Sequence, residues 1–349
     1  MIRVFLLIAV LLSVFPAFAA PCTDGTCDSL AVRAILDANG LTDVAVDSVV
    51  EWNGNHRITD LDLKRRGLTT LPAVIGDISE MTEVFVQGNQ IPSIPDEIGN
   101  LSRLAWLIIS GNNLTEVPAS IGNLTAMRVL SLHENDINAL PEEMGSLTEM
   151  TTLNIYSNNL TELPKAIGAM NKMTSISFNN NEISVLPDTL HNLTQLMTLN
   201  MQMNKIAVLP AWIGNFTRLS RLYVHFNLLT DLPEEIMDLS RMTWLNLGYN
   251  RLCSIDSAVA AWADSNDRDW QDTQLCDTTG VYLPAPFIPV NCHAQDLGNT
   301  KVYIYNTSGR LMRVITNGRE QIGALPSGLY YFIFRTGNKT ITDKRIHIR

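Results

Sequence analysis

The sequence predicts an α/β solenoid followed by a small, separate all-β sandwich. Asparagine recurs every 23 residues through the middle of the chain, and this spacing never slips. The eight positions are Asn89, Asn112, Asn135, Asn158, Asn181, Asn204, Asn227 and Asn250. Within each unit apolar residues alternate, as at Leu153 and Ile155, which is typical of a short strand with one buried side. After Cys276 the repeat stops and strand-like runs follow.

The composition excludes several classes of protein before any motif is considered. A chain of 349 residues exceeds what one ordinary compact core serves, so we expect several domains or an elongated repeat array. Because 46% of the residues are hydrophobic and only 17% are charged, wholesale disorder is excluded. The formal net charge of −10 argues against a nucleic-acid partner, since phosphates are bound by basic surfaces.

The N-terminus has the three parts of a secretory signal peptide. Arg3 precedes an apolar run over residues 4–15, and the tripeptide AFA at 17–19 offers a small-residue cleavage site. We therefore expect a signal peptide over residues 1–19. A membrane anchor is the alternative, but a run of about 12 apolar residues falls short of the roughly 20 that span a bilayer. Lipidation of Cys22 is a weaker alternative, because the preceding residues lack the usual aliphatic lead-in. After removal of the signal peptide we expect no transmembrane helix.

The five cysteines lie only at the ends of the repeat region and beyond it, and export would allow them to form disulfides. We predict the pairs Cys22–Cys27 and Cys253–Cys276, which leaves Cys292 without a partner. Closing the second loop, of about 24 residues, would contribute roughly 3 kcal/mol in the chain-entropy model. A thiol nucleophile or a metal site is the alternative, but no histidine lies at metal-ligand spacing from either pair. We expect no metal.

Residues 150–172, MTTLNIYSNNLTELPKAIGAMNK, illustrate the repeating unit. Its inward apolar residues are hidden only by stacking on neighbouring units, so one unit alone would not fold. The asparagine can donate to and accept from backbone groups that the turn leaves unpaired, which predicts a structural ladder with no catalytic role. The leucine-proline step fixes the backbone on the opposite side, where short helical turns are expected. Glycines such as Gly99, Gly122 and Gly145 are expected to close those turns with positive φ.

This unit, with its LPxxIGxL second half, resembles the 23-residue form of the leucine-rich repeat that occurs in the group related to Ras-binding repeat proteins. The resemblance implies a right-handed horseshoe with a parallel sheet on its concave side. We expect about nine such units over residues 58–251.

Departures from the unit fall at both ends of the array, where an open core requires a cap. We expect an N-terminal cap over residues 20–57, in which an amphipathic helix from Asp28 to Asn39 covers the core. Its covering side chains are predicted to be Leu30, Ile35 and Leu36. Residues 252–277 resemble the cysteine-paired caps of secreted leucine-rich repeat proteins, with Trp262 and Trp270 sealing the last unit.

The C-terminal segment differs in composition and in charge. Three prolines mark a stiff linker over residues 278–292, and strand-like runs follow it. Residues 297–349 hold nine Lys and Arg against two Asp and Glu, a net charge of +7, whereas residues 21–296 have a net charge of −18. This partition indicates a separate role for the tail.

The pattern VYIYNTSGRLMRVI, followed by LPSGLYYFIFR, resembles the C-terminal sorting domain of the type IX secretion system of Bacteroidetes and related bacteria. Gly309, Gly328 and Tyr330 carry the match, which covers residues 293–349. The resemblance implies that the outer-membrane secretion machinery is a partner that reads this segment and removes it. The protein would then be secreted or lie at the cell surface of a bacterium. An ordinary all-β accessory domain is the alternative.

Strand residues that flank the inward pair are expected to face the concave surface, with aromatic residues gathered towards its two ends and polar ones such as Asn179 in the middle. Exposed Trp, Tyr and Arg dominate binding hot spots, and the core pattern does not require them here. Packing of these rings across adjacent strands is the alternative. The predicted ligand-binding residues are Phe85, Trp106, Tyr156, Arg221, Tyr223, His225, Phe226, Trp244 and Tyr249.

We expect a non-catalytic protein that binds another protein through its concave face, without a cofactor. The histidines are scattered over different units, and His133 and His225 lie about 19 Å apart by strand spacing. No phosphate-binding loop, HExxH or GxSxG motif occurs. One alternative is a glycan-binding or structural envelope protein that stacks the same aromatic residues on sugar rings. A second is a secreted effector with an unrecognised enzymatic activity.

Overall fold

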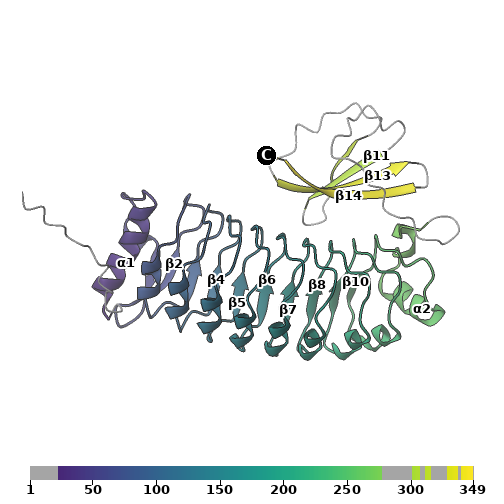
Figure 1. The fold of residues 1–349 in the computed structure, drawn as a ribbon, viewed down its shortest axis with the longest axis horizontal. Helices are drawn as coiled ribbons and strands as arrows, with labels where there is room; N and C mark the ends of the chain where they lie inside the picture. The colour runs from purple at the N-terminus through teal and green to yellow at the C-terminus, as the bar shows by residue number, and fades with distance from the viewer. Residues whose placement is uncertain (1–22, 277–300, 307–310, 316–327, 337–338, 349) are drawn as a thin grey trace, which may run out of the picture.

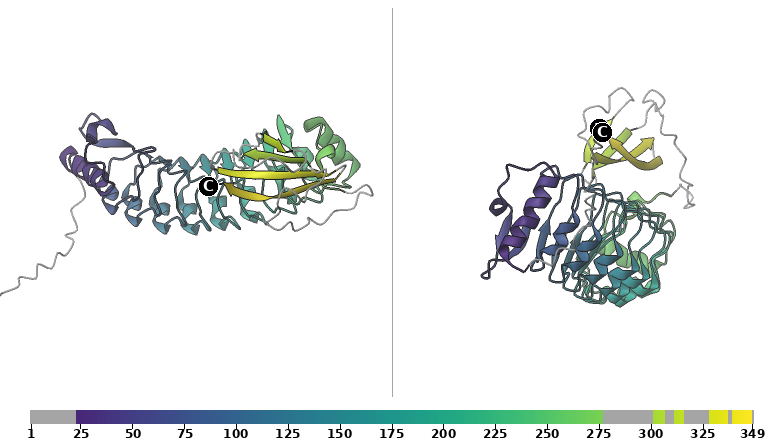
Figure 2. Two further views of the ribbon diagram at one scale, coloured as in Figure 1. Left: turned by 90° about the horizontal axis from the view of Figure 1, so that it is seen from above. Right: turned by 60° about the vertical axis from the view of Figure 1, so that its left-hand side comes forward.

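The computed structural model describes residues 23–276 and the strand residues 301–306, 311–315, 328–336 and 339–348. Figure 1 shows an elongated solenoid of stacked strands with a helix at each end, and Figure 2 shows α1 and α2 at opposite ends in two further views. The predicted signal peptide, the predicted linker, Cys22 and Cys292 lie outside the described residues.

Ten strands form the sheet of the solenoid, in the same order as in the chain. The short strand β1 (Val50–Trp52) runs antiparallel to β2 (Ile58–Asp62), and each later strand runs parallel to the one before it. The later strands are β3 (Glu83–Phe85), β4 (Trp106–Ile108), β5 (Val129–Ser131), β6 (Thr152–Asn154), β7 (Ser175–Ser177), β8 (Thr198–Asn200), β9 (Arg221–Tyr223) and β10 (Trp244–Asn246). The middle residue of each of these later strands is buried. The predicted solenoid with a parallel sheet is confirmed.

A short 3-10 helix forms the opposite side of each unit, and each one is preceded by the proline of the leucine-proline step. These helices are η2 (Ala73–Asp77), η3 (Asp96–Asn100), η4 (Ala119–Asn123), η5 (Glu142–Ser146), η6 (Lys165–Ala169), η7 (Asp188–Asn192), η8 (Ala211–Asn215) and η9 (Glu234–Asp238). The fixed φ of proline suits the residue that leads into such a turn.

The prediction that Gly99, Gly122 and Gly145 have positive φ is wrong, because positive φ occurs elsewhere in the unit. These glycines are required by the close approach of the next unit. A Cβ atom added to Gly122 would lie 2.4 Å from the carbonyl oxygen of Glu143. The left-handed conformation instead belongs to the residue directly before the ladder asparagine, such as Glu134 with φ of 56°.

The recurring asparagines are buried and bind the backbone of two units. Asn158 is 2% exposed, and its Oδ1 accepts a hydrogen bond from the N–H of Ile137 at 3.0 Å. Its Nδ2 donates to the carbonyl oxygens of Leu132 and Ile155, each at 3.1 Å. The same acceptor geometry recurs at the other seven ladder positions. Each asparagine therefore pairs backbone groups that would otherwise be buried and unsatisfied.

The N-terminal cap is the helix α1 (Gly25–Ala38), which buries Val32, Ile35 and Leu36 against the first unit. The prediction for Leu30 is wrong, because its side chain is 66% exposed. Residues two apart on a helix point to nearly opposite sides, so Leu30 faces away from the surface that buries Val32.

A buried ion pair fastens this cap to the repeats. Asp28 is fully buried and accepts hydrogen bonds from Arg57 Nε at 2.7 Å and from the N–H of Ile58 at 3.0 Å. The hydrogen bond between Arg57 and Asp28, with the attraction of the carboxylate, raises the pKa of Arg57 against the opposing effect of desolvation. Since a buried carboxylate is stable only when paired, the pair fixes the position of α1.

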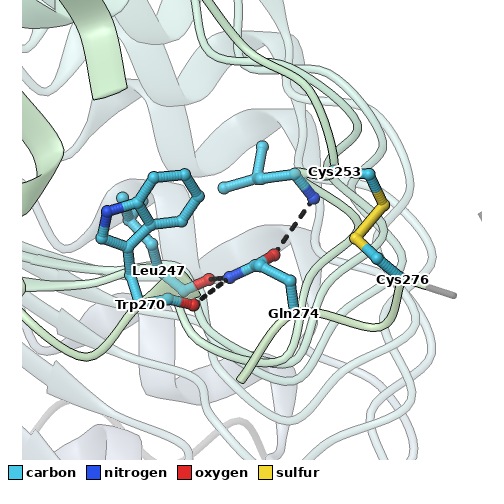
Figure 3. Close-up of a disulfide and its surroundings, with 6 residues drawn as sticks. Leu247, Cys253, Trp270, Gln274 and Cys276 are labelled. Atoms are coloured by element: carbon cyan, nitrogen blue, oxygen red, sulfur yellow. Dashed lines mark hydrogen bonds between the residues drawn. A yellow bond between two sulfur atoms is a disulfide. The ribbon is translucent and has the colours of Figure 1, made fainter. Parts of the chain in front are cut away.

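The C-terminal cap contains α2 (Ser257–Asn266) and a disulfide between Cys253 and Cys276, whose Cα atoms are 5.6 Å apart. Figure 3 shows Gln274 beside this disulfide, donating to the carbonyl oxygens of Leu247 at 3.1 Å and Trp270 at 2.7 Å. Trp270 is 3% exposed, and Trp262 is partly buried against the core. Cys27 in the other cap is also disulfide-bonded.

The four strands of the C-terminal segment form one antiparallel sheet in the order β12-β11-β13-β14. They are β11 (Lys301–Asn306), β12 (Leu311–Ile315), β13 (Gly328–Thr336) and β14 (Lys339–Ile348). A sandwich needs a second sheet, and the described residues of this segment belong to one sheet, so the sandwich stays a prediction.

We expect Asn158→Ala to lower the free energy of unfolding by roughly 1–3 kcal/mol, because it leaves buried backbone donors and acceptors without partners. Urea denaturation measures this change. The control is Asn113→Ala, which removes an exposed asparagine and should leave the midpoint unaltered. Equal midpoints for the two variants would contradict the role of the ladder.

Candidate functional site

The candidate site lies on the solvent-facing side of the parallel sheet, which we call the strand face. In each unit three residues belong to this face. Two of them flank the buried strand residue, and the third lies two positions after the second, just beyond the strand. In the unit of β9 these are Arg221, Tyr223 and His225, with Leu222 buried between the first two. Equivalent residues of successive units lie on neighbouring strands, so the face is built of rows with members 23 residues apart.

The nine predicted ligand-binding residues are distributed unevenly along this face. Phe85 and Trp106 lie on β3 and β4 towards the N-terminal end, far from β9 and β10 in Figure 1. Lys64 Nζ lies 4.6 Å from the centroid of the Phe85 ring, and Trp106 is 43% exposed. The remaining predicted residues lie in the middle and towards the C-terminal end.

A hollow of about 510 Å³ lies on the strand face across the units of β5 to β10. We call it the amide hollow, after its four Asn and Gln side chains. Its lining includes four predicted residues, namely Tyr156, Tyr223, His225 and Trp244. The other lining residues are Glu134, Ser177, Asn179, Asn200, Gln202 and Asn246. The structure thus gathers residues from several units into one concave site.

Six of the ten lining residues were not predicted as ligand-binding, because polar residues on an open sheet resemble ordinary solvated surface. The sequence does contain a signal for some of them. Asn179, Gln202 and His225 stand 23 residues apart, so they occupy equivalent positions in consecutive units. An unbroken row of side chains that both donate and accept hydrogen bonds, directly beside aromatic residues, is the pattern to seek.

Aromatic rings stand at both ends of the amide hollow. At one end Tyr156 stacks on His133 with ring centroids 4.2 Å apart and planes inclined by 14°. The Nδ1 atom of His133 is hydrogen-bonded to Ser131 Oγ at 2.8 Å, which holds the pair in place. At the other end Tyr223 and Trp244 lie 6.4 Å apart with planes inclined by 39°.

Phe226 and Tyr249 form a separate stack, with centroids 4.3 Å apart and planes inclined by only 2°. Both residues have φ of 55°, in the left-handed region that bulky side chains rarely adopt. They occupy the position before the ladder asparagine, where Gly88 and Gly111 meet the same backbone requirement in earlier units. The fold imposes this conformation, and the two aromatic residues occupy it at an energetic cost.

Two polar atoms in the lining of the amide hollow are buried without a hydrogen-bond partner. They are Oδ1 of Asn179 and Nδ1 of His225, and these residues are 5% and 8% exposed. Buried polar atoms are nearly always paired, because leaving one unpaired is energetically unfavourable. A ligand in the hollow that turned these side chains towards itself and supplied the missing partners would relieve this penalty.

Burial keeps both histidine rings of this region neutral at neutral pH. Burial lowers the pKa of His225 from 6.5 to about 4, and burial has the same effect on the pKa of His133. Burial, together with the negative charge of Glu134, raises the pKa of Tyr156 to about 12. The lining of the hollow contains one acidic side chain, that of Glu134, and no Lys or Arg.

The described residues offer neither a metal site nor a membrane-spanning helix. No group of three or more His, Cys, Asp or Glu side chains in this part of the chain could hold a metal ion. Among the same residues, no helix has the length and apolar character required to cross a membrane.

We expect the free energy of unfolding to fall with decreasing pH in a manner that depends on His225. The unfolded state binds a proton near pH 6.5 and the folded state only near pH 4, so acid favours unfolding between these values. Between pH 7 and pH 5 this one residue should account for about 2 kcal/mol. Urea denaturation of the unmodified chain and of His225→Gln at both pH values measures the difference. An identical loss in both proteins would show that His225 is not buried in its neutral form.

A family model described as a leucine-rich repeat region matches residues 55–159 and 153–259, which together make up more than half of the chain. A search of the curated proteins returns no match.

Several solved structures share the architecture. A leucine-rich repeat protein of Leptospira interrogans is 27% identical, with a TM-score of 0.53 over 64% of this chain and 60% of that one. The ectodomain of the Arabidopsis thaliana receptor kinase GASSHO1/SCHENGEN3, in complex with CASPARIAN STRIP INTEGRITY FACTOR 2, is 28% identical with a TM-score of 0.52. That match covers 56% of this chain and 26% of the ectodomain. A plant ice-binding protein, 22% identical with a TM-score of 0.54 over 66% of this chain and 80% of its own, shares the fold alone.

The chain spans less than two thirds of the length of the Leptospira and Arabidopsis structures. The 23-residue period, the buried asparagine ladder and the parallel sheet agree with the family match over the same residues. This chain belongs to the leucine-rich repeat family.

Proposed function

We propose that this chain binds another protein, without catalysis, through the strand face of its leucine-rich repeats. Leucine-rich repeats typically bind proteins and usually serve as non-catalytic scaffolds. The observation that carries the proposal is a group of exposed side chains at the C-terminal end of this face. We call Arg221 and Trp244, which lie on this face, together with the exposed Met197, which directly precedes β8, the exposed cluster.

The exposed cluster has the chemistry of a binding hot spot. Arg221 and Trp244 are direct neighbours on parallel strands, and the Trp244 side chain is 56% exposed. Met197 is 49% exposed and directly precedes Thr198, to whose Oγ1 atom Arg221 Nε donates a hydrogen bond at 3.0 Å. This bond orients the guanidinium while its other N–H groups stay available. Trp and Arg supply most of the energy at protein interfaces, and a folded monomer gains little by exposing them.

The comparison with the Arabidopsis ectodomain supports the same conclusion. That protein is 28% identical to this chain and was solved in complex with CASPARIAN STRIP INTEGRITY FACTOR 2. A repeat array of this type therefore binds a partner in at least one relative of similar fold. Fold alone does not identify a partner, so the exposed cluster carries the proposal for this chain.

The proposal includes export. The charged, apolar and small-residue parts of segment 1–19 support a signal peptide. The motif match over residues 293–349, the net charge of +7 over residues 297–349 and the strands β11 to β14 support a sorting domain of the type IX secretion system. The leucine-rich repeats would then act at the cell surface or outside a bacterial cell, after removal of this tail.

Export is tested by the intact mass of the protein recovered from outside its native cells, measured without reduction. We expect a species that begins at Ala20 and lacks the C-terminal segment. A species that begins at Ala20 but retains Arg349 would contradict removal of a sorting domain. A species that retains Met1 and the residues after it would contradict the signal peptide.

Binding is tested with the chain from residue 20 onwards, used to capture surface proteins of the source cells. We expect Arg221→Ala combined with Trp244→Ala to weaken binding of a specific partner at least tenfold, because hot-spot residues each contribute about 2 kcal/mol or more. The matched control is Val185→Ala combined with Val208→Ala, which alters two exposed residues outside the strands, 71% and 69% exposed. Proteins captured by the control and lost from the double variant are the partners. If no captured protein distinguishes the two variants, the exposed cluster is not an interface.

A further inference from the structure

We infer that the amide hollow is a binding site for a neutral oligosaccharide. This goes beyond the proposed protein interface, which is carried by the exposed cluster beside it. The two surfaces share the Trp244 side chain, but most of the lining of the hollow lies outside the exposed cluster. Substitutions at residues other than Trp244 can therefore remove one binding surface while the other stays intact.

The lining of the amide hollow suits the hydroxyl groups of a sugar. Seven of the ten lining side chains carry a carboxamide or a hydroxyl group, and such groups both donate and accept hydrogen bonds. These seven are Tyr156, Ser177, Asn179, Asn200, Gln202, Tyr223 and Asn246. Sugar hydroxyls also donate and accept, so they match this set without leaving groups unpaired. None of the ten residues is aliphatic, whereas the core of a protein interface is predominantly apolar.

The lining of the amide hollow contains polar atoms without hydrogen-bond partners. Oδ1 of Asn179 and Nδ1 of His225 are buried and have no partner. Asn179, Gln202 and His225 occupy equivalent positions in three consecutive units and so form one row. Adjacent strands place such residues about 4.8 Å apart. The row thus offers hydrogen-bonding groups at regular intervals along the solenoid. A linear chain of hydroxylated rings can satisfy groups that are arranged in this way.

Aromatic rings close both ends of the amide hollow. Tyr156, stacked on His133, closes one end of the amide hollow, and Tyr223 with Trp244 closes the other. Tyrosine and tryptophan combine an apolar ring with a polar atom, so they suit ligands that have both apolar faces and hydroxyl groups. A pyranose ring has this character, because its C–H bonds form apolar patches between its hydroxyls. The ends of the hollow therefore provide stacking and the middle provides hydrogen bonds.

Charge decides between neutral and acidic sugars. The lining contains one acidic side chain, that of Glu134, and no Lys or Arg. His225 stays neutral at neutral pH because it is buried. Sulfate, phosphate and carboxylate groups are normally bound by Arg, Lys or protonated His. Arg221 neighbours Trp244 but does not belong to the lining, so an acidic glycan finds no counter-charge within the hollow itself. A neutral oligosaccharide needs none.

The test titrates the chain from residue 20 onwards with malto-, cello-, manno- and xylo-oligosaccharides, followed by tryptophan fluorescence and calorimetry. Oligogalacturonate serves as the acidic probe. We expect saturable binding of at least one neutral oligosaccharide and no binding of oligogalacturonate. Asn179→Ala should weaken that binding roughly tenfold, since it removes a buried hydrogen-bonding group. The melting temperature of the Asn179→Ala variant should stay the same or rise, because an unpaired buried atom is removed. Gln202→Ala is a second variant, and we expect it to weaken oligosaccharide binding to the same extent.

Gln87→Ala is the matched control. Gln87 occupies the position of Asn179 four units earlier, and its Oε1 atom is also buried without a partner, but it does not line the hollow. We expect Gln87→Ala to bind the oligosaccharide as tightly as the unmodified chain. Arg221→Ala should also keep oligosaccharide binding, although it weakens capture of a protein partner. This pair of results separates the site in the hollow from the proposed interface.

Two outcomes would overturn the inference. The first is that no neutral oligosaccharide of the panel binds; if Asn179→Ala then also loses the captured protein partner, the hollow is part of the protein interface. The second is that Asn179→Ala and Gln202→Ala both bind as tightly as Gln87→Ala, which would place the sugar elsewhere. Failure of protein capture alone leaves the oligosaccharide result intact, so the two proposals fail separately.

Discussion

The buried asparagine ladder is the interaction on which the rest of this structure depends. After each strand the chain turns inward and leaves backbone donors and acceptors away from water. The side chain of Asn158 pairs such groups in its own unit and in the unit before it, and its equivalents do the same along the array. Because each amide joins two units, it sets the distance and the register between them. A parallel sheet of three-residue strands needs this support, since each strand forms few hydrogen bonds of its own.

The register set by the ladder explains the other features of the solenoid. Neighbouring units approach so closely that Gly122 has no space for a Cβ atom beside Glu143. The residue before each ladder asparagine takes the left-handed conformation whatever its side chain, which places Phe226 and Tyr249 in one stack. The two ends have no neighbour to hide their apolar faces. At the N-terminal end, a helix held by the buried carboxylate of Asp28 covers the apolar face. At the C-terminal end, a disulfide-bonded cap covers it.

The strand face combines two kinds of recognition chemistry on one rigid frame. Its exposed Arg and Trp side chains suit a protein surface, whereas the row of amides suits a ligand rich in hydroxyl groups. Both arise because residues 23 positions apart become neighbours on the sheet. A repeat array changes such a row one residue at a time without altering its core, so binding chemistry varies freely while the ladder stays the same.

The sequence by itself determined the period, the strands, the proline-led turns and the ladder, because each depends on a local pattern that repeats. It also determined the cysteine-paired C-terminal cap, because Cys253 and Cys276 lie where the repeat stops. The tertiary structure decided what depends on distances between units. It placed Leu30 on the exposed side of its helix rather than against the core, and the glycines serve close approach rather than positive φ. It also gathered Tyr156, Asn179 and His225 into one hollow. Burial and the pairing of polar atoms depend on neighbouring units, and one unit's sequence does not contain them.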